Sequence, residues 1–255
     1  MTWTKWLHQQ IRLTITMIFA IIALTGKSTK LWTFPATSKA NDLPLELNFK
    51  PPNNGAPGNR EDDGSRPGCP NVEKPFIALI PVTNWGETVS EYPTFWLYIP
   101  YGFGSVDLVL EDENTQEKIY QTKFNITDRP GIASFGLPLD APPLDLGRKY
   151  RWQFLFFCSD NQSYDLSVDG IVKRVEKTSE LISQLATAKT LREQIIVYAE
   201  NGLWYETLTE LAKLRRANPQ DAQIAADWAA LFEHRFVRYE GYDIISEPIV
   251  QCCSL

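Results

Sequence analysis

Histidine is the scarcest informative residue in this chain, with His8 and His234 as the only two among 255 residues. A zinc or iron site built from several histidines is therefore excluded. The four cysteines do not form two C-x2-C pairs, so we expect no metal site. A Ser-His-Asp or Cys-His mechanism would have to use His234, because His8 lies in a predicted N-terminal signal. His234 falls at the polar end of a predicted helix, which is typical of a surface or helix-terminal histidine.

Positive charge is also limited. The chain has 25 Lys and Arg residues against 31 Asp and Glu residues, for a formal net charge of −6. Nucleic-acid binding requires a basic face, so we expect no nucleic-acid partner. The pair Gly102 and Gly104 lacks the third glycine of a dinucleotide-binding loop, and the sequence contains no G-x-S-x-G motif. We therefore expect no cofactor.

Long hydrophobic runs are absent except near the N-terminus, where Leu13 to Leu24 carry no charge. Residues 1–40 contain five basic and no acidic residues, and a basic start followed by a short apolar run is typical of a secretory signal. This run is shorter than the roughly 20 residues that span a membrane. We predict a signal peptide over about 1–40 and a periplasmic or secreted protein. The alternative is an anchor in the inner membrane through residues 13–24, which would be the protein's only membrane contact.

Proline, glycine and asparagine dominate residues 50–70, and we predict a flexible linker over 41–70. Short apolar runs with period-two alternation follow, separated by turn residues. They predict seven strands, at 76–81, 94–100, 106–111, 118–125, 132–137, 150–158 and 166–175. The fold class is therefore α+β, and residues 71–177 are expected to form an antiparallel, immunoglobulin-like β-sandwich.

The apolar period changes to about 3.6 residues after residue 178, which predicts a helical domain over 178–255. Four helices are expected, at 179–187, 191–201, 203–217 and 221–236, followed by a C-terminal tail. The residues from Tyr198 to Pro219 resemble one tetratricopeptide-type unit, although Ile195 and Thr207 stand where small residues are usual. One unit is too short for a free-standing solenoid, so we expect it to pack on the sandwich. An ordinary helical hairpin or bundle is the alternative.

An ordered series of motifs extends along most of the chain. The motifs include Thr94–Tyr101, Tyr150–Trp152, Tyr198–Tyr205 and the pair Asn218-Pro219. In this series the sequence resembles the cyanobacterial family DUF928, over roughly residues 68–253. The resemblance implies an exported cyanobacterial protein of unknown function, and it transfers no catalytic residue.

The cysteines lie at 69, 158, 252 and 253, beyond the predicted signal, in a compartment that permits disulfides. A Cys69–Cys158 bond would join the linker to a core strand. In the chain-entropy model, a disulfide that closes a loop of this length adds about 4–5 kcal/mol to the free energy of unfolding. Cys252 and Cys253 would then pair with each other or stay reduced, and crossed pairings remain open.

Two acidic clusters are the remaining candidates for acid–base chemistry or calcium binding. They are Glu61, Asp62 and Asp63 in the predicted linker, and Glu111, Asp112 and Glu113 in a predicted turn. Both lack the spacing of a calcium loop, and solvated turns are their ordinary interpretation. A carboxylate-based hydrolase acting on envelope glycans nevertheless remains the alternative function.

Aromatic residues are in local excess between residues 85 and 103. If Phe95 faces the sandwich core, then Trp96 and Tyr98 point outward on the same strand. Outward aromatics can stack on sugar rings or anchor a protein partner. We therefore predict a binding surface that consists of Trp85, Trp96, Tyr98 and Tyr101. The alternative is that Trp96 and Tyr98 lie beneath the helices. The leading functional hypothesis is a non-enzymatic interaction module of the cell envelope that binds a protein or a polysaccharide.

Overall fold

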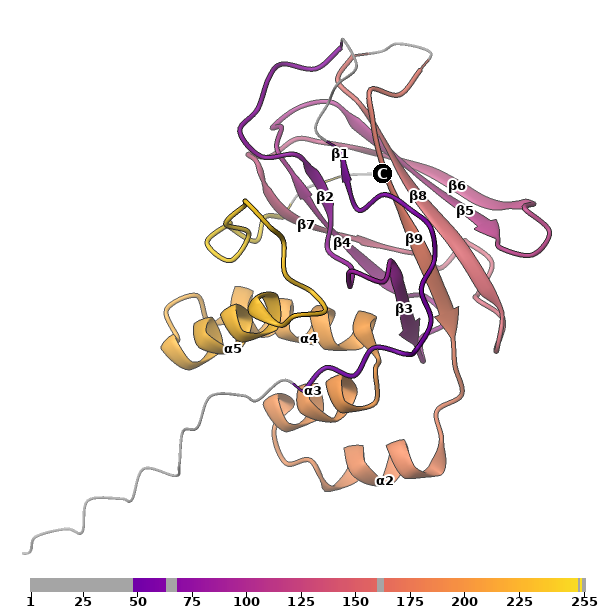
Figure 1. The fold of residues 1–255 in the computed structure, drawn as a ribbon, viewed down its shortest axis with the longest axis vertical. Coiled ribbons are helices and arrows are strands. Elements are labelled where there is room, and N and C mark those ends of the chain that lie inside the picture. Colours follow the sequence, from indigo (N-terminus) through magenta and orange to yellow (C-terminus); the bar gives the residue numbers. More distant parts are fainter. Residues whose placement is uncertain (1–47, 63–67, 160–162, 252, 254–255) are drawn as a thin grey trace, which may run out of the picture. The chain divides into compact units, whose positions relative to one another are not determined.

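A computed structural model of the protein describes residues 48–62, 68–159, 163–251 and 253. The predicted signal at 1–40 lies outside the described residues. Within the described part, no helix is long and apolar enough to cross a membrane. The architecture is α+β, with two β-sheets followed by helices (Figure 1).

Each sheet combines strands that are distant in sequence. The four-stranded sheet has the order β1 (Glu61–Asp62), β2 (Phe76–Ala78), β4 (Thr94–Ile99), β7 (Gly131–Gly136). The five-stranded sheet has the order β3 (Trp85–Thr88), β9 (Leu166–Arg174), β8 (Lys149–Phe157), β5 (Ser105–Asp112), β6 (Lys118–Asn125). All neighbouring strands are antiparallel except β3 and β9, which are parallel.

Aromatic side chains from both sheets meet in the core. Along β8, every second residue from Tyr150 to Phe156 is buried, as the alternating sequence predicts. The ring of Phe154 lies 5.8 Å from that of Phe95 on β4 and 5.2 Å from that of Phe135 on β7. Such pairs add about 0.5–1.5 kcal/mol each to the free energy gained by apolar burial. Phe95 therefore faces the core between the two sheets.

Seven predicted strands are confirmed in position, but β1 and β3 are not among the predictions. Both are short, and β3 contains a glycine that weakens its strand pattern. Gly86 is needed there because a Cβ atom would lie 2.7 Å from Cε2 of Tyr205. A helix therefore approaches this strand closely, which period-two patterning alone does not reveal.

The predicted flexible linker over 41–70 is wrong for the described residues 48–62. Phe49 is 1% exposed, and its ring lies 5.2 Å from that of Trp204. The backbone N–H of Lys50 donates to the carbonyl of Ala199 at 3.2 Å, and Asn59 N–H donates to Asp169 Oδ1 at 2.8 Å. The segment is fixed because its few apolar and hydrogen-bonding groups find partners in both the sheets and the helices.

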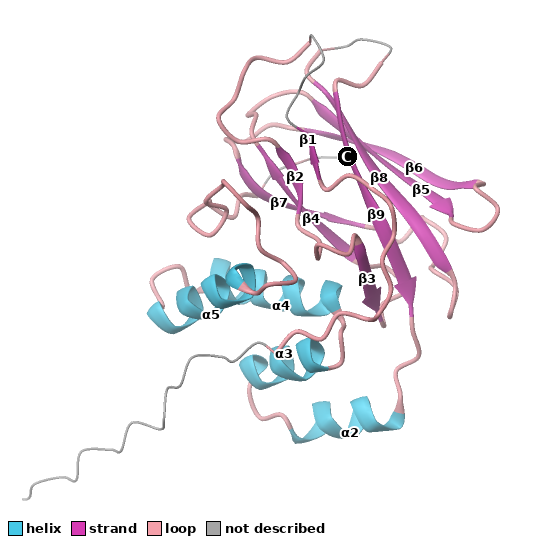
Figure 2. Ribbon diagram, viewed as in Figure 1, coloured by secondary structure: helices cyan, strands magenta, loops and turns pink. Residues whose placement is uncertain are grey.

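The described helices are α2 (Ser179–Thr187), α3 (Leu191–Glu200), α4 (Trp204–Ala217) and α5 (Ala222–Glu233), close to the predicted ranges (Figure 2). Side chains of Thr178, Thr190 and Asp221 cap α2, α3 and α5 by accepting backbone N–H bonds. Residues 43–255 form one compact unit, so the helices and the sheets are not separate bodies. The predicted division into two domains at 177/178 thus does not mark a gap in packing.

Helix α4 connects the helices to both sheets. The Tyr205 hydroxyl accepts from Trp152 Nε1 at 2.8 Å and donates to the carbonyl of Ile171 at 3.2 Å. Trp204 Nε1 donates to the carbonyl of Leu79 at 3.0 Å. These bonds satisfy the polar ends of the large buried rings of Trp152, Trp204 and Tyr205 where α4 packs against the sheets.

Candidate functional site

The predicted aromatic binding surface is buried. Its four members, Trp85, Trp96, Tyr98 and Tyr101, are between 4% and 5% exposed. The expectation that Trp96 and Tyr98 face solvent is therefore wrong. For Trp96, the alternative of burial beneath the helices is confirmed, because its Nε1 donates to Thr209 Oγ1 on α4 at 3.0 Å.

Different groups lie against the other three aromatic residues. Tyr101 donates its hydroxyl to the carbonyl of Pro70 at 3.1 Å. The ammonium of Lys149 lies 5.1 Å from the ring of Trp85. Tyr98 is buried, and burial raises the pKa of its hydroxyl, with Glu247 adding to the effect. The sequence correctly located an aromatic cluster, but it did not show that loops and helices cover its outer face.

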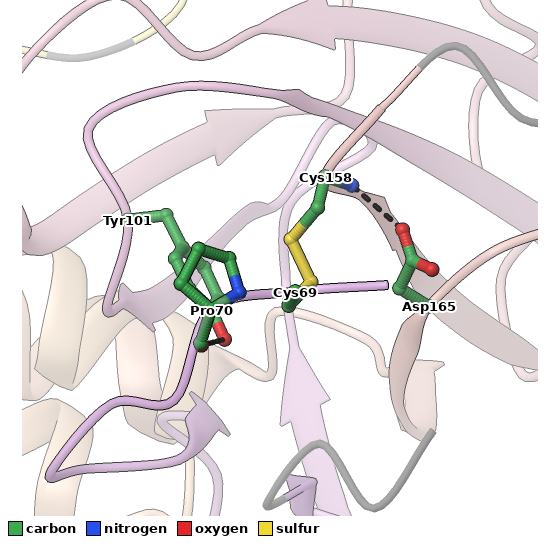
Figure 3. Close-up of a disulfide and its surroundings, with 5 residues drawn as sticks. All are labelled: Cys69, Pro70, Tyr101, Cys158 and Asp165. Atoms are coloured by element: carbon green, nitrogen blue, oxygen red, sulfur yellow. Dashed lines mark hydrogen bonds between the residues drawn. A yellow bond between two sulfur atoms is a disulfide. The ribbon is translucent and has the colours of Figure 1, made fainter. Parts of the chain in front are cut away.

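The structure contains the predicted Cys69–Cys158 disulfide, which closes a sequence separation of 89 residues (Figure 3). The Cys158 N–H donates to Asp165 Oδ2 at 2.8 Å. These three residues are close enough to resemble a metal-binding group, but both sulfur atoms are used in the disulfide. The second predicted pair, Cys252 with Cys253, includes Cys252, which lies outside the described residues.

The acidic cluster at 111–113 stabilises a turn. Asp112 is fully buried, which corrects the expectation of a solvated turn. Its Oδ1 accepts from the N–H groups of Thr115 and Asn114 at 2.8 and 2.9 Å, and its Oδ2 pairs with Arg148. The bonds from these two N–H groups hold the pKa of Asp112 below its ordinary value. In the other cluster, Asp63 lies outside the described residues, while Asp62 accepts from the N–H of Ser167.

His234 caps the end of α5, as the sequence suggests for a helix-terminal histidine. Its ring lies 6.4 Å from that of Phe49 and 5.6 Å from that of Phe236. Burial lowers the pKa of the imidazole, and the neighbouring Arg235 lowers it further. Neither a serine nor a cysteine is among the hydrogen-bond partners described for it.

A pocket of about 280 Å³ lies between α4 and the loop that joins β3 to β4. We call it the α4 pocket. The loop contributes Val89, Ser90, Tyr92 and Pro93, and the strand ends beside it contribute Thr88 of β3 and Thr94 of β4. Helix α4 contributes Tyr205, Glu206, Thr209, Glu210 and Lys213. The α4 residues recur at intervals of three to four, so they form one face of the helix. Most of the lining is polar, in contrast to the buried aromatic cluster next to it.

Glu206 is the central polar residue of the α4 pocket. Its Oε1 accepts from Thr88 Oγ1 at 2.6 Å and from the N–H of Val89 at 2.9 Å. Its Oε2 is buried and has no hydrogen-bond partner among the described residues. A buried carboxylate oxygen without a donor costs about 1–3 kcal/mol or more, so a donor from outside the fold would stabilise it.

Burial raises the pKa of Glu206, while the bonds from Thr88 and Val89 act in the opposite direction. The pKa of Tyr198 on α3 is also raised, by burial first and then by the negative charges of Glu206 and Glu210. These effects place a weakly solvated acidic region at the base of the pocket.

The second carboxylate of the pocket, that of Glu210, differs from Glu206 because it pairs with a lysine. Glu210 lies one helical turn after Glu206, on the same face of α4, and Lys213 Nζ donates to its Oε1 at 2.8 Å. Two carboxylates on one helix face approach a ligand from the same side. The pocket therefore presents acceptors, hydroxyl groups and the side chains of two tyrosines, Tyr92 and Tyr205, to a small polar group.

The family model described as Domain of Unknown Function (DUF928) matches residues 61–249. The chain belongs to the DUF928 family. No curated protein matches this DUF928 chain. The matched range contains both sheets, all described helices and every lining residue of the α4 pocket.

Sequence reasoning missed Glu206 in this DUF928 protein. A signal was present, because Glu206 lies in the tetratricopeptide-like stretch from Tyr198 to Pro219 and directly follows two aromatic residues. Its partners Thr88 and Val89, however, come from β3 and the loop after it, and that strand was not predicted. Without the strand, no pattern connects residue 206 with residue 88.

Proposed function

We propose that this protein is an exported, non-enzymatic interaction protein of the cyanobacterial cell envelope, and that its α4 pocket binds a polysaccharide. The observation that carries the proposal is the unpartnered, buried Oε2 of Glu206 in a pocket with a polar lining. A sugar hydroxyl is a donor of the right kind for this oxygen. The half-buried ring of Tyr92 offers an apolar face at the same pocket.

The dimensions of the pocket favour a polysaccharide over a protein partner. A volume of about 280 Å³ is close to the lower end for small-ligand pockets, and it suits one unit of a polymer. Protein partners usually bind across broader surfaces with a buried aromatic centre. The aromatic residues that were candidates for such a centre are covered. Binding of an envelope protein is therefore an outcome that the experiment must distinguish.

A carboxylate-based hydrolase is the second candidate, because the raised pKa of Glu206 is a property of general acids. Glycoside hydrolysis commonly uses two carboxyl groups on either side of the bond, about 5–9.5 Å apart. In the α4 pocket, the other lining carboxylate is Glu210, which lies on the same helix face and pairs with Lys213. This arrangement favours binding over hydrolysis.

Several finer proposals come from the sequence. Residues 1–40 are proposed as a signal peptide that directs the protein to the periplasm or the medium, with an inner-membrane anchor through 13–24 as the alternative. The two sheets are proposed as an immunoglobulin-like sandwich. The helices are proposed as a C-terminal bundle with one tetratricopeptide-like unit, in which Gly202 joins α3 to α4 with a φ of +73°. The N-terminal sequence of the native protein tests the signal, and retention of residues 1–24 in a membrane fraction would favour the anchor.

The binding proposal is tested with immobilised polysaccharide purified from a cyanobacterial envelope and freed of protein. We expect the wild-type protein to be retained. Glu206→Gln and Tyr92→Ala should each bind about tenfold more weakly, because the first loses a hydrogen bond to a charged group and the second loses a stacking ring. Tyr120→Ala is the matched control, because Tyr120 is half-buried on β6 and does not line the pocket.

Equal retention of Tyr92→Ala, Glu206→Gln and Tyr120→Ala would remove the α4 pocket from the binding site. Release of reducing ends by the wild type but not by Glu206→Gln would favour the hydrolase. Retention only on a fraction that still contains envelope protein would favour a protein partner.

A further inference from the structure

A second pocket, of about 480 Å³, lies where the ordered segment before β1 meets the end of α5. We call it the N-terminal pocket. Its lining consists of residues 48–55, Thr83 and residues 234–236. It shares no residue with the α4 pocket. The segment 48–55 is held in place by the buried ring of Phe49 and by the hydrogen bond from Lys50 N–H to the carbonyl of Ala199. One wall of the pocket is therefore part of the packed fold.

The charge of the N-terminal pocket is opposite to that of the whole chain. Its charged lining residues are Lys50 and Arg235, and none of its lining residues is acidic. Neither cation forms a salt bridge with a carboxylate within the described ranges. The chain as a whole has a net charge of −6, so an anion would be attracted only locally. Two unneutralised cations in one concave site favour an anionic ligand.

Uncharged polar groups accompany these cations. The side chains of Asn48, Asn53 and Asn54 provide amide donors and acceptors at the pocket. Thr83 lines the pocket as well, and its Oγ1 is buried without a hydrogen-bond partner in the described part of the chain. A buried hydroxyl without a partner is uncommon in a folded protein, so it points to a ligand or a bridging water.

The pocket also has flat apolar surfaces. Pro51, Pro52 and Phe236 are half-buried, and the guanidinium of Arg235 lies 4.5 Å from the centre of the Phe236 ring. This contact holds the charge of Arg235 beside an apolar face. Small inorganic anions usually bind at dense groups of backbone N–H donors or paired arginines. A volume of about 480 Å³ with separated cations, amides and apolar faces fits a larger, hydroxyl-bearing anion.

We infer that the N-terminal pocket binds an acidic saccharide unit, with its carboxylate or sulfate at Arg235 and Lys50 and its hydroxyl groups at the asparagines and Thr83. His234 lines the same pocket, where burial and then the charge of Arg235 lower the pKa of its imidazole. The charged residues that line the pocket with it are Arg235 and Lys50. A bound anion would offset the effect of Arg235 and favour the imidazolium form.

The test measures binding of trigalacturonate to the purified protein by calorimetry, with maltotriose as the neutral probe and inorganic phosphate as the small anion. We expect saturable binding of trigalacturonate that weakens as salt is added, and much weaker binding of maltotriose and phosphate. Arg235→Ala should weaken trigalacturonate binding about tenfold or more, and Arg235→Lys should retain part of it.

The matched control is Arg129→Ala, which removes one exposed arginine from a loop outside the pocket and changes the net charge equally. Arg235 is exposed, and so its replacement is expected to leave the melting temperature unchanged, which a thermal scan verifies. Equal weakening by Arg235→Ala and Arg129→Ala would overturn the inference, because it would indicate a general charge effect. Binding of maltotriose or phosphate as tight as that of trigalacturonate would also overturn it. Because the α4 pocket is intact in all these variants, such a failure would leave the proposed function untouched.

Discussion

At the scale of single residues, Glu206 connects the end of β3 to the first turn of α4. One of its oxygens accepts from Thr88 and Val89, and the other is buried without a partner. The same carboxylate therefore holds the loop beside the α4 pocket with one oxygen and leaves the other oxygen to accept a hydrogen bond from a ligand. This double role makes Glu206 the residue whose replacement is most informative.

The Glu206→Gln variant should reveal the raised pKa of Glu206 in the pH dependence of stability. Burial lifts this pKa above its ordinary value of 4.5, so the folded state keeps a proton that the unfolded chain releases. The stability due to the protonated form is complete below pH 4.5 and is lost as pH rises through the folded-state pKa. We expect the free energy of unfolding of the wild type, relative to the variant, to fall over this rise in pH. Urea titrations at several pH values measure it, and a constant difference would contradict the assignment.

Asp227 is a second residue whose burial has a clear consequence. It is fully buried on α5, and Arg192 on α3 donates to both of its oxygens, at 2.7 and 3.0 Å. Asp227→Ala should lower the free energy of unfolding by about 3–5 kcal/mol, because it leaves a partly buried guanidinium without its carboxylate. Glu233→Ala, which removes an exposed carboxylate from the same helix, should change it by less than about 0.5 kcal/mol. Chemical denaturation of the two variants compares them, and equal values would show that the pair adds nothing.

At the scale of secondary-structure elements, the sequence located the long strands and the helices well. Period-two and 3.6-residue patterns are strong in β8 and in α4, because each buries one regular face. The direction of Trp96 was mistaken because an outward strand position faces solvent only if no other element covers it. The bond from Trp96 to Thr209 joins residues 113 positions apart, and local periodicity contains no information about such a pairing.

The candidate site was harder to predict than the fold. Its lining includes Thr88 at the end of β3, a strand of four residues that pairs in parallel with β9. Short strands with glycine lack a readable alternation, so Thr88 could not be placed opposite Glu206. The Cys69–Cys158 bond was one of three possible pairings of the four cysteines, and the predicted export favoured disulfides without deciding among these pairings.

This disulfide should contribute strongly to stability. It closes a separation of 89 residues between the segment before β2 and the end of β8. A Cys69→Ser/Cys158→Ser variant should lose about 4–5 kcal/mol of unfolding free energy, which is the loop entropy restored to the unfolded chain. Denaturation of the variant and of the reduced wild type measures the loss. A wild type that is equally stable with and without reductant, or free thiols at both positions in a mass map, would contradict the prediction.

At the scale of the whole molecule, residues 43–255 are one compact unit in which α4 shares its buried face with both sheets. Removal of the helices would expose Trp96 and Trp152, so the sheets are not expected to remain stable alone. We predict a single unfolding transition, with the same midpoint by tryptophan fluorescence and by far-ultraviolet circular dichroism. Two separate midpoints would indicate that the sheets and the helices unfold independently.

The most direct test of the polysaccharide-binding proposal is an amide NMR titration of the wild-type protein with soluble, protein-free envelope polysaccharide. The proposal predicts saturable shifts concentrated in the α4 pocket, at residues such as Ser90, Glu206 and Lys213. The same titration of Tyr92→Ala should need about tenfold more ligand. An absence of shifts in these residues at saturating polysaccharide, or shifts of equal size in Tyr92→Ala at the same ligand concentrations, would contradict it.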